Sequence, residues 1–205
     1  MNILILAAHP DDEVLGVGCA IAKHVRDGDN VVACVFTQGR GLNAELAFFK
    51  SCKYLGIRGL SVPGYKDNET DLNSLLHMVK DVEKLGVNEW DRVYTHSDKD
   101  LNIDHQRIGR ACMTAFRPHV SRAEILTFEV PSSTDLGKPF NPNVFLEVDE
   151  DLGWKKLRAL DFYKLEMRDF PHPRSNEYIL SLMKIRGSQS GTRLAEAYEL
   201  QRKIL

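Results

Sequence analysis

An imidazole and two aspartates stand together near the start of the chain, in the run His9-Pro10-Asp11-Asp12-Glu13. The apolar residues 3–8 before this run predict a buried strand, and the apolar spacing over residues 13–25 predicts a helix after it. Open α/β sheets place ligands and catalytic groups in the crevice at the carboxyl ends of their strands. A strand-to-helix turn with these side chains therefore predicts a metal or catalytic site.

A second cluster of the same chemical type lies far away in the sequence, in the run His96-Ser97-Asp98-Lys99-Asp100-Leu101-Asn102-Ile103-Asp104-His105. It also follows a strand-like segment, residues 92–95, and precedes a predicted helix over residues 104–116. The first run alone could be an acidic turn that complements a helix dipole. Because the second cluster stands at a corresponding strand end, we expect the two clusters to form one site.

Imidazole nitrogen and carboxylate oxygen suit zinc, and a catalytic zinc site takes three protein ligands and leaves a fourth position for water. His9 and Asp12 can reach one ion from the same turn, and His105 can complete the set from the second cluster. Iron(II) also fits a site of this kind. Metal binding lowers the pKa of the water toward neutrality. Asp11, which is next to Asp12 but faces differently, is placed to take the water proton.

The elements that must position these residues alternate between strands and helices along the chain. This alternation predicts an α/β fold with a mostly parallel sheet and helices on both faces, formed as a single domain over residues 1–205. Residues 131–142 predict a loop over the site, and the part of the chain from residue 150 onward is expected to be mostly helical. The predicted strands are 2–8, 31–36, 60–62, 92–95, 124–128 and 144–148, and the predicted helices before residue 150 are 13–25, 44–55, 72–85 and 104–116.

Composition excludes several classes of partner. The 205 residues include 27 basic and 29 acidic side chains, and the basic ones are spread along the chain, so nucleic acid and membrane surfaces are not expected to bind. No apolar run approaches the roughly 20 residues that span a bilayer. The first apolar run lacks a basic flank and is interpreted as a buried strand, not a signal peptide, so we expect a cytoplasmic protein. The four cysteines form no CxxC pair and lie outside both clusters, which predicts reduced thiols that do not bind zinc.

The two clusters and several later segments resemble the LmbE/PIG-L family of zinc-dependent N-acetyl deacetylases, and the resemblance runs nearly the length of the chain. It implies a Rossmann-like three-layer sandwich, one zinc ion, and removal of an acetyl group from an N-acetylglucosamine-type amino sugar joined to another moiety. Carried over by position, it implies that His9, Asp12 and His105 bind zinc and that Asp11 is the general base. Family members are often multimeric, so a homo-oligomer is a further expectation. The resemblance is carried by residues 8–16, 95–107, 128–133, 140–145, 186–191 and 195–197.

One position departs from the family pattern. Several members have a histidine three residues before the second histidine ligand, where it is thought to protonate or stabilise the tetrahedral intermediate, but this chain has Asn102. An amide can donate a hydrogen bond to a developing oxyanion but cannot act as a general acid. Asp104 keeps its place and is expected to assist catalysis or to orient His105. The proton for the leaving amine would then come from Asp11 or from His96.

Other polar residues are weaker candidates for substrate binding. Arg40 follows the second strand and could pair with a phosphate or carboxylate, or be a solvated loop arginine. Glu129 ends a strand on the ligand side and could bond sugar hydroxyls or cap the next loop. His96 could contact substrate or be a satisfied histidine at a strand end. Asp100 is expected to shape its loop, and His172 to lie at a rim or an oligomer contact.

Three other functions compete with deacetylation. An amidase acting on a different amide, such as a thiol-sugar conjugate, would keep the metal site and change the loops. A nucleotide-binding module is disfavoured, because Ile21 occupies the third glycine position of G-x-G-x-x-G and no phosphate-binding P-loop is present. A catalytically silent sugar-binding or metal-binding protein is disfavoured by Asp11, since such a protein has no need of a base beside the metal.

Overall fold

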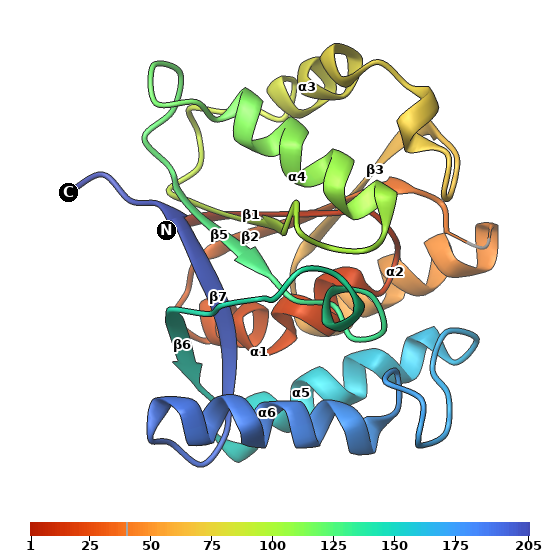
Figure 1. The fold of residues 1–205 in the computed structure, drawn as a ribbon, viewed down its shortest axis with the longest axis vertical. Coiled ribbons are helices and arrows are strands. Elements are labelled where there is room, and N and C mark those ends of the chain that lie inside the picture. Colours follow the sequence, from red (N-terminus) through yellow and green to blue (C-terminus); the bar gives the residue numbers. More distant parts are fainter. Residues whose placement is uncertain (40) are drawn as a thin grey trace.

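The computed structural model describes residues 1–39 and 41–205, and the described strands form one seven-stranded sheet (Figure 1). The strand order is β3-β2-β1-β4-β5-β7-β6. Strands β1 to β5 pair in parallel, whereas β7 is antiparallel to both of its neighbours. The mostly parallel α/β sheet is thereby confirmed. The strands are β1 (Asn2–Ala7), β2 (Asn30–Thr37), β3 (Arg58–Tyr65), β4 (Arg92–His96), β5 (Glu124–Phe128), β6 (Val144–Glu147) and β7 (Ala195–Arg202).

Helices cover both faces of the sheet, as predicted. Strands that are buried on both sides are apolar at nearly every position, and β1 is an example. Ile3 and Ile5 face a core shared with α1, α2, α5 and α6, whereas Leu4 and Leu6 face a core shared with α3 and α4. This arrangement confirms the three-layer sandwich. The helices are α1 (Asp12–Arg26), α2 (Leu42–Leu55), α3 (Leu75–Glu83), α4 (Ile103–Ala115), α5 (Glu150–Leu160) and α6 (Asn176–Ser190), with short 3-10 turns η1 (Thr70–Leu72), η2 (Thr134–Leu136) and η3 (Asp161–Tyr163).

The end of the chain differs from the sequence expectation. The expected helices after residue 150 are present as α5 and α6, but residues 195–202 form strand β7 between β5 and β6. The strand carries the buried acid Glu196, which hides the alternation of apolar residues. Its carboxylate accepts hydrogen bonds from Lys156 Nζ at 2.7 Å and from two backbone amides of α1 at 2.9 Å. A buried charge that is fully paired in this way is tolerated inside a strand.

Two glycines allow helices to approach the strand ends closely. A Cβ atom on Gly16 of α1 would lie 2.2 Å from the ring of Phe128, and one on Gly109 of α4 would lie 2.6 Å from the carbonyl oxygen of His96. No real Cβ atom fits at these distances. The second turns of α1 and α4 therefore lie close to the carboxyl ends of β5 and β4, respectively.

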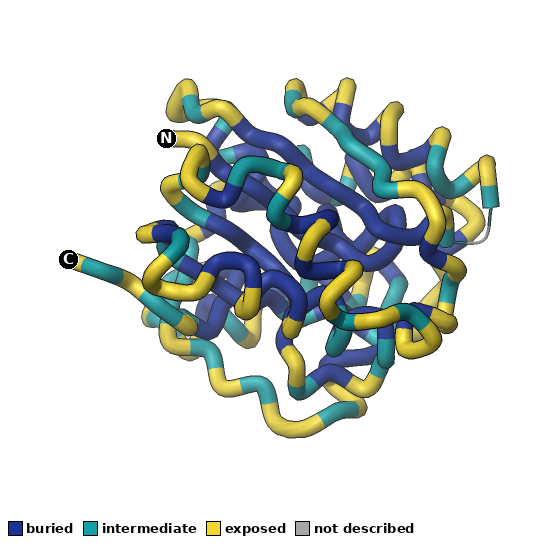
Figure 2. Tube along the Cα trace, turned by 90° about the horizontal axis from the view of Figure 1, so that it is seen from above, coloured by how far each residue is buried: buried dark blue, intermediate teal, exposed yellow. Residues whose placement is uncertain are grey.

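The outer surface is formed mainly by the exposed sides of the helices and by the loops, while the inner strands β1, β2, β4 and β5 are mostly buried (Figure 2). The four cysteines are buried and unpaired. Across residues 1–39 and 41–205, no helix combines the length and apolar character needed to span a bilayer.

Candidate metal centre and active site

The two polar clusters meet at the carboxyl ends of β1 and β4. These strands are parallel neighbours, with Leu6 paired to Thr95, so the residues that follow each strand emerge side by side. The chain continues from β1 to β2 on one side of β1 and reaches β4 on the other side, which makes this the point where the strand order reverses. A crevice forms at such a switch point in open α/β sheets.

Three buried side chains converge at this crevice. His9 Nδ1 lies 3.0 Å from Asp12 Oδ2 and 3.2 Å from His105 Nε2, and the last two atoms are 3.2 Å apart. Tetrahedral zinc with bonds of about 2.0–2.1 Å places its donor atoms roughly 3.3 Å apart. The three atoms thus fit one face of a tetrahedral metal site. The predicted ligand set is brought together.

Neighbouring carboxylates orient both imidazoles. His105 Nδ1 lies 3.2 Å from Asp100 Oδ2, and His9 Nε2 lies 2.9 Å from Asp104 Oδ2 and 3.0 Å from Asp67 Oδ1. Each of these nitrogens therefore carries the proton, and the lone pairs of the two remaining nitrogens face the same point as Asp12 Oδ2. Three electron-pair donors directed at one point are suited to binding a cation between them.

The outer carboxylates are ionised and well held. Burial by itself raises the pKa of Asp100, but hydrogen bonds with His105, Thr134 and Ser133 outweigh it and hold the pKa at about 2. Burial is likewise outweighed at Asp104, whose pKa is held at about 2 by hydrogen bonds with His9 and Thr70. The expectation that Asp104 orients His105 is wrong: Asp104 faces His9, and Asp100 is the acid beside His105.

Asp11 adjoins the three converging side chains without being one of them. Its backbone has φ 107°, a conformation that costs energy for a residue other than glycine and that occurs mostly at functional sites. Its amide donates to Glu13 Oε2 at 3.1 Å, and its Oδ2 accepts from Arg174 Nη1 at 2.8 Å. Burial raises the pKa of this carboxyl well above its usual range, against the opposing charge of Arg174. Among the described residues, its Oδ1 has no hydrogen-bond partner.

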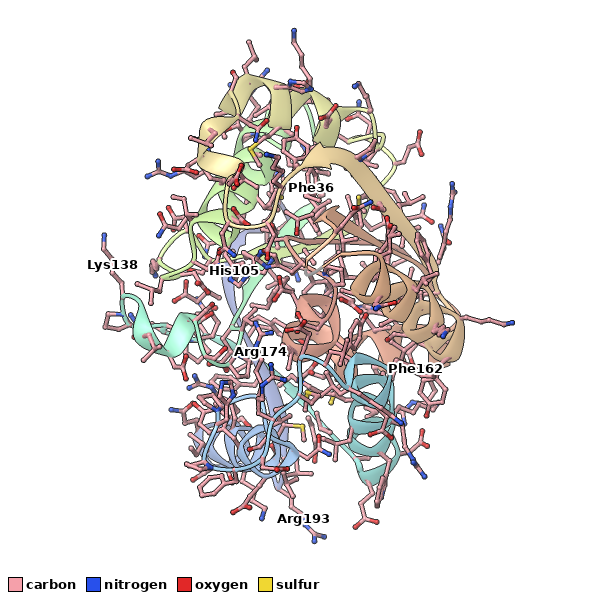
Figure 3. The ribbon with its side chains drawn as sticks, turned by 90° about the vertical axis from the view of Figure 1, so that its right-hand side faces the viewer. Phe36, His105, Lys138, Phe162, Arg174 and Arg193 are labelled. Carbon is pink, nitrogen blue, oxygen red and sulfur yellow. The ribbon has the colours of Figure 1, made fainter. Side chains whose placement is uncertain are left out.

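Tyr163 and Arg174 stabilise the turn that contains Asp11 and Glu13. The sequence patterns did not connect these two residues with the turn. Tyr163 donates a hydrogen bond from its hydroxyl to Glu13, the acid that accepts the Asp11 amide. Burial raises the pKa of Glu13 to about 7. Arg174 also donates from Nε to Ser132 Oγ at 3.1 Å. In Figure 3, the labelled His105 lies above Arg174. Both Tyr163 and Arg174 are 150 or more positions away from the turn, and no spacing pattern marks them.

Asn102 begins α4 and lines the crevice. Its Oδ1 accepts from the amides of Asp104 at 2.8 Å and His105 at 3.4 Å, which is an N-cap. Because Oδ1 is used in this way, Nδ2 is the group left to face outward, and it lies 3.5 Å from Asn68 Oδ1. A cavity of about 310 Å³ opens here, lined by residues that include His9, Asp11, Asn102, Ser132, His172 and Arg174. Its volume suits a monosaccharide.

Two of the expected substrate contacts do not line this cavity. His96 is buried under the site: its Nε2 accepts from the Ala8 amide at 2.8 Å and its ring stacks on His105 with centroids 3.9 Å apart. Burial, with the neighbouring His105, lowers the pKa of His96 to about 4, so it is not a donor of protons at neutral pH. Glu129 is bound by Arg186 through two contacts of 2.7 and 2.5 Å. Arg40 lies outside the described residues.

Comparisons with known proteins identify relatives of this chain. Residues 4–116 match the PIG-L family, described as GlcNAc-PI de-N-acetylase. The Escherichia coli K12 protein called uncharacterized deacetylase YaiS is 31% identical over 173 residues, which cover 80% of this chain and 90% of that protein.

Two solved structures illustrate what the fold alone can support. The N,N'-diacetylchitobiose deacetylase of Pyrococcus horikoshii superposes with a TM-score of 0.79 at 19% identity, over 98% of this chain and 83% of its own. The 4-carboxy-2-hydroxymuconate hydratase GalB of Pseudomonas putida KT2440 superposes with a TM-score of 0.72 at 20% identity, over 100% of this chain and 97% of its own. A deacetylase and a hydratase thus share this fold, so the reaction must be argued from the site.

Proposed function

Because the chain belongs to the PIG-L family of de-N-acetylases, we propose that it is a metal-dependent hydrolase that removes the acetyl group from an N-acetylglucosamine-type amino sugar. The convergence of His9 Nδ1, Asp12 Oδ2 and His105 Nε2 within 3.2 Å, with Asp11 beside them, is the observation that carries this proposal. The cavity of about 310 Å³ offers room for one sugar ring over these groups.

His9, Asp12 and His105 would hold the ion, and zinc or iron(II) fits this set of nitrogen and oxygen donors. When bound, the ion supplies an acidified water and polarises the acetyl carbonyl. The protein contributes the orientation of the two imidazoles through Asp100 and Asp104. These carboxylates keep the donor lone pairs of His9 and His105 directed inward.

Asp11 would move the proton. One carboxylate oxygen is held by Arg174, and the other is free to accept the proton of the attacking water. The hydroxide oxygen bonds to the acetyl carbon, and Asp11 gives the proton to the amide nitrogen as the carbon–nitrogen bond breaks. Acetic acid and the free amine leave, so that one water is consumed and Asp11 returns to its ionised form.

Asn102 would stabilise the negative charge that develops on the acetyl oxygen. Its amide group lines the cavity, and the cap on α4 fixes the direction of the side chain. A preorganised donor of this kind acts without rearranging during the reaction. Asp104 would assist by holding His9. The same set of residues would also hydrolyse a different amide, such as that of a thiol-sugar conjugate.

Release of primary amine tests the proposal. Zinc-loaded protein would be assayed on N-acetylglucosamine, its glycosides and thiol-sugar amides, beside the nearly isosteric variant Asp11→Asn. We expect kcat to fall about 100-fold or more in Asp11→Asn, with one equivalent of zinc retained. Asp151→Asn is the matched control, because Asp151 is an exposed aspartate on α5.

Three results bear on the alternatives. Turnover confined to thiol-sugar amides would replace deacetylation by the amidase function. No amine from any compound, with zinc bound, would indicate a silent binding protein. Full activity in Asp11→Asn would contradict the assigned base.

A further inference from the structure

A second cavity adjoins the metal-site cavity and differs from it in chemistry. It has a volume of about 530 Å³ and lies between α2 and the segment that contains η3. Its apolar wall is formed by side chains of both elements and consists of Ala44, Ala47, Phe162, Tyr163 and Leu165, while polar side chains form the rest of the lining: Asn43, Lys50, Asp161, Lys164 and Glu166. Figure 3 labels Phe162 in this wall.

The two cavities share part of their lining. Ala44 of α2 and Glu166, which follows η3, line both of them. Glu166 Oε2 lies 3.5 Å from Arg174 Nη1, the same atom that contacts Asp11. A molecule whose reacting group lies at Asp11 therefore has the second cavity directly beside it.

Exposed apolar side chains give the second cavity its character. Leu165 is 67% exposed, and Phe162 is also exposed at the surface. Large apolar side chains gathered beside a polar site are a common feature of ligand-binding surfaces. The metal-site cavity is lined instead mainly by charged and amide side chains. The contrast fits a ligand with one polar part and one apolar part.

We propose that this second cavity, here named the α2–η3 subsite, binds an apolar group joined to C1 of the amino sugar. The inference rests on the proposed deacetylase function. In a 2-acetamido sugar the acetamide is on C2, and C1, one of its two neighbouring ring carbons, is the anomeric carbon that carries the aglycone. A group on C1 therefore begins close to the reacting amide and extends away from it. An alkyl or aryl aglycone in the α2–η3 subsite would be removed from water, whereas a small aglycone would gain little there.

A pair of substrates that differ only in the aglycone tests the inference. Methyl and hexyl 2-acetamido-2-deoxy-β-D-glucosides would be compared with the zinc-loaded protein. Burial of two of the additional methylenes gives about a tenfold gain. We expect kcat/KM for the hexyl glycoside to be higher by at least that factor, chiefly through a lower KM. Equal kcat/KM for the two glycosides would overturn the proposal.

Two substitutions in the apolar wall test whether the preference for the hexyl glycoside arises in the α2–η3 subsite. Ala47→Phe fills the cavity, and Leu165→Glu places a charge in its wall. Each should lower the hexyl-to-methyl ratio of kcat/KM at least fivefold. Leu76→Glu is the matched control, because Leu76 is a 61% exposed leucine on α3, on the other face of the sheet. A ratio unchanged in Leu165→Glu, or lowered equally in Leu76→Glu, would overturn the assignment.

A binding measurement separates this proposal from the reaction. Hexyl β-D-glucoside has no acetamide, and its binding can be followed by calorimetry whether or not the protein is a deacetylase. Binding to wild type and at least fivefold weaker binding to Leu165→Glu would support the α2–η3 subsite even if no glycoside is hydrolysed. Hydrolysis of both glycosides without binding of hexyl β-D-glucoside would leave the deacetylase function intact and overturn the subsite.

Discussion

Arg174 reaches across the crevice to Asp11, with its Nη1 atom 2.8 Å from Asp11 Oδ2. The same guanidinium donates to Ser132 Oγ and faces Glu166, so its position is fixed from three sides. One oxygen of Asp11 is thereby occupied, and the carboxylate plane is set relative to Asp12. Arg174 lies outside residues 4–116, the part of the chain that matches the family. The later part of the chain thus completes the proposed active site.

Replacing Arg174 should lower turnover more than substrate binding. In Arg174→Met the Asp11 carboxylate loses its partner and its fixed orientation, and a misplaced base costs about 10- to 100-fold in kcat. KM should change less than kcat, because the Arg174 guanidinium is already engaged by Asp11 and Ser132. Arg174→Lys should recover part of kcat, since lysine keeps the charge but not the planar fork. Steady-state kinetics on the best substrate of the amine-release panel would measure both constants.

The control for this substitution is Arg193→Met. Arg193 is an exposed arginine that pairs only loosely with Glu150, at 3.7 Å, and it lies far from the site (Figure 3). An effect confined to KM, or an equal loss in Arg174→Met and Arg193→Met, would argue against a positioning role for Arg174.

The sequence predicted the ligand triad for a local reason. His9 and Asp12 follow β1 closely, and His105 lies in the first turn of α4, the helix that follows β4. Because β1 and β4 are parallel neighbours that end at the same edge of the sheet, the three side chains are expected to lie close together. The sequence did not predict which aspartate hydrogen-bonds which imidazole, because the pairing depends on how residues 97–102 fold back over the carboxyl end of β4. That loop brings Asp100 to His105 and leaves Asp104 facing His9.

Long-range contacts and buried charges limited the rest of the prediction. Tyr163 and Arg174 reach the turn through tertiary packing, which leaves no periodic signal in the sequence. Strand β7 was missed because a polar residue, Glu196, occupies a buried position, and its partner Lys156 stands 40 residues earlier. Local sequence patterns therefore predict the sheet and the turn that carries His9 and Asp12. They do not predict the contacts of Tyr163 and Arg174 with this turn.

Removing the acid beside His105 should weaken metal binding. In Asp100→Asn the imidazole loses the carboxylate that fixes its proton on Nδ1, and loss of such a partner costs about 10- to 100-fold in metal affinity. Asp104→Asn should have a similar effect through His9. Competition with a chromophoric zinc chelator would measure the dissociation constants. Asp98→Asn is the control, because Asp98 is an exposed aspartate in the same loop.

The zinc affinities of these variants distinguish the possible supporting acids. If Asp100→Asn and Asp98→Asn bind zinc equally well, Asp100 does not orient a metal ligand. A loss in Asp104→Asn alone would assign the supporting role to the acid beside His9.

Protonation of the buried His96 should destabilise the fold in acid. Burial holds its pKa at about 4 in the folded protein, below the ordinary value of 6.5. As the pH falls below 6.5, the unfolded chain takes up a proton that the folded chain does not, so the free energy of unfolding decreases until the pH nears 4. His96→Gln keeps an acceptor for the Ala8 amide but has no ring to protonate.

Wild type should therefore lose about 2 kcal/mol more than His96→Gln when metal-free protein is taken from about pH 7 to about pH 4.5. Urea denaturation at the two pH values would give both free energies. Titrating groups remote from His96 contribute to both proteins and cancel in the difference. Parallel pH dependence in the two proteins would contradict the lowered pKa of His96 in the folded state.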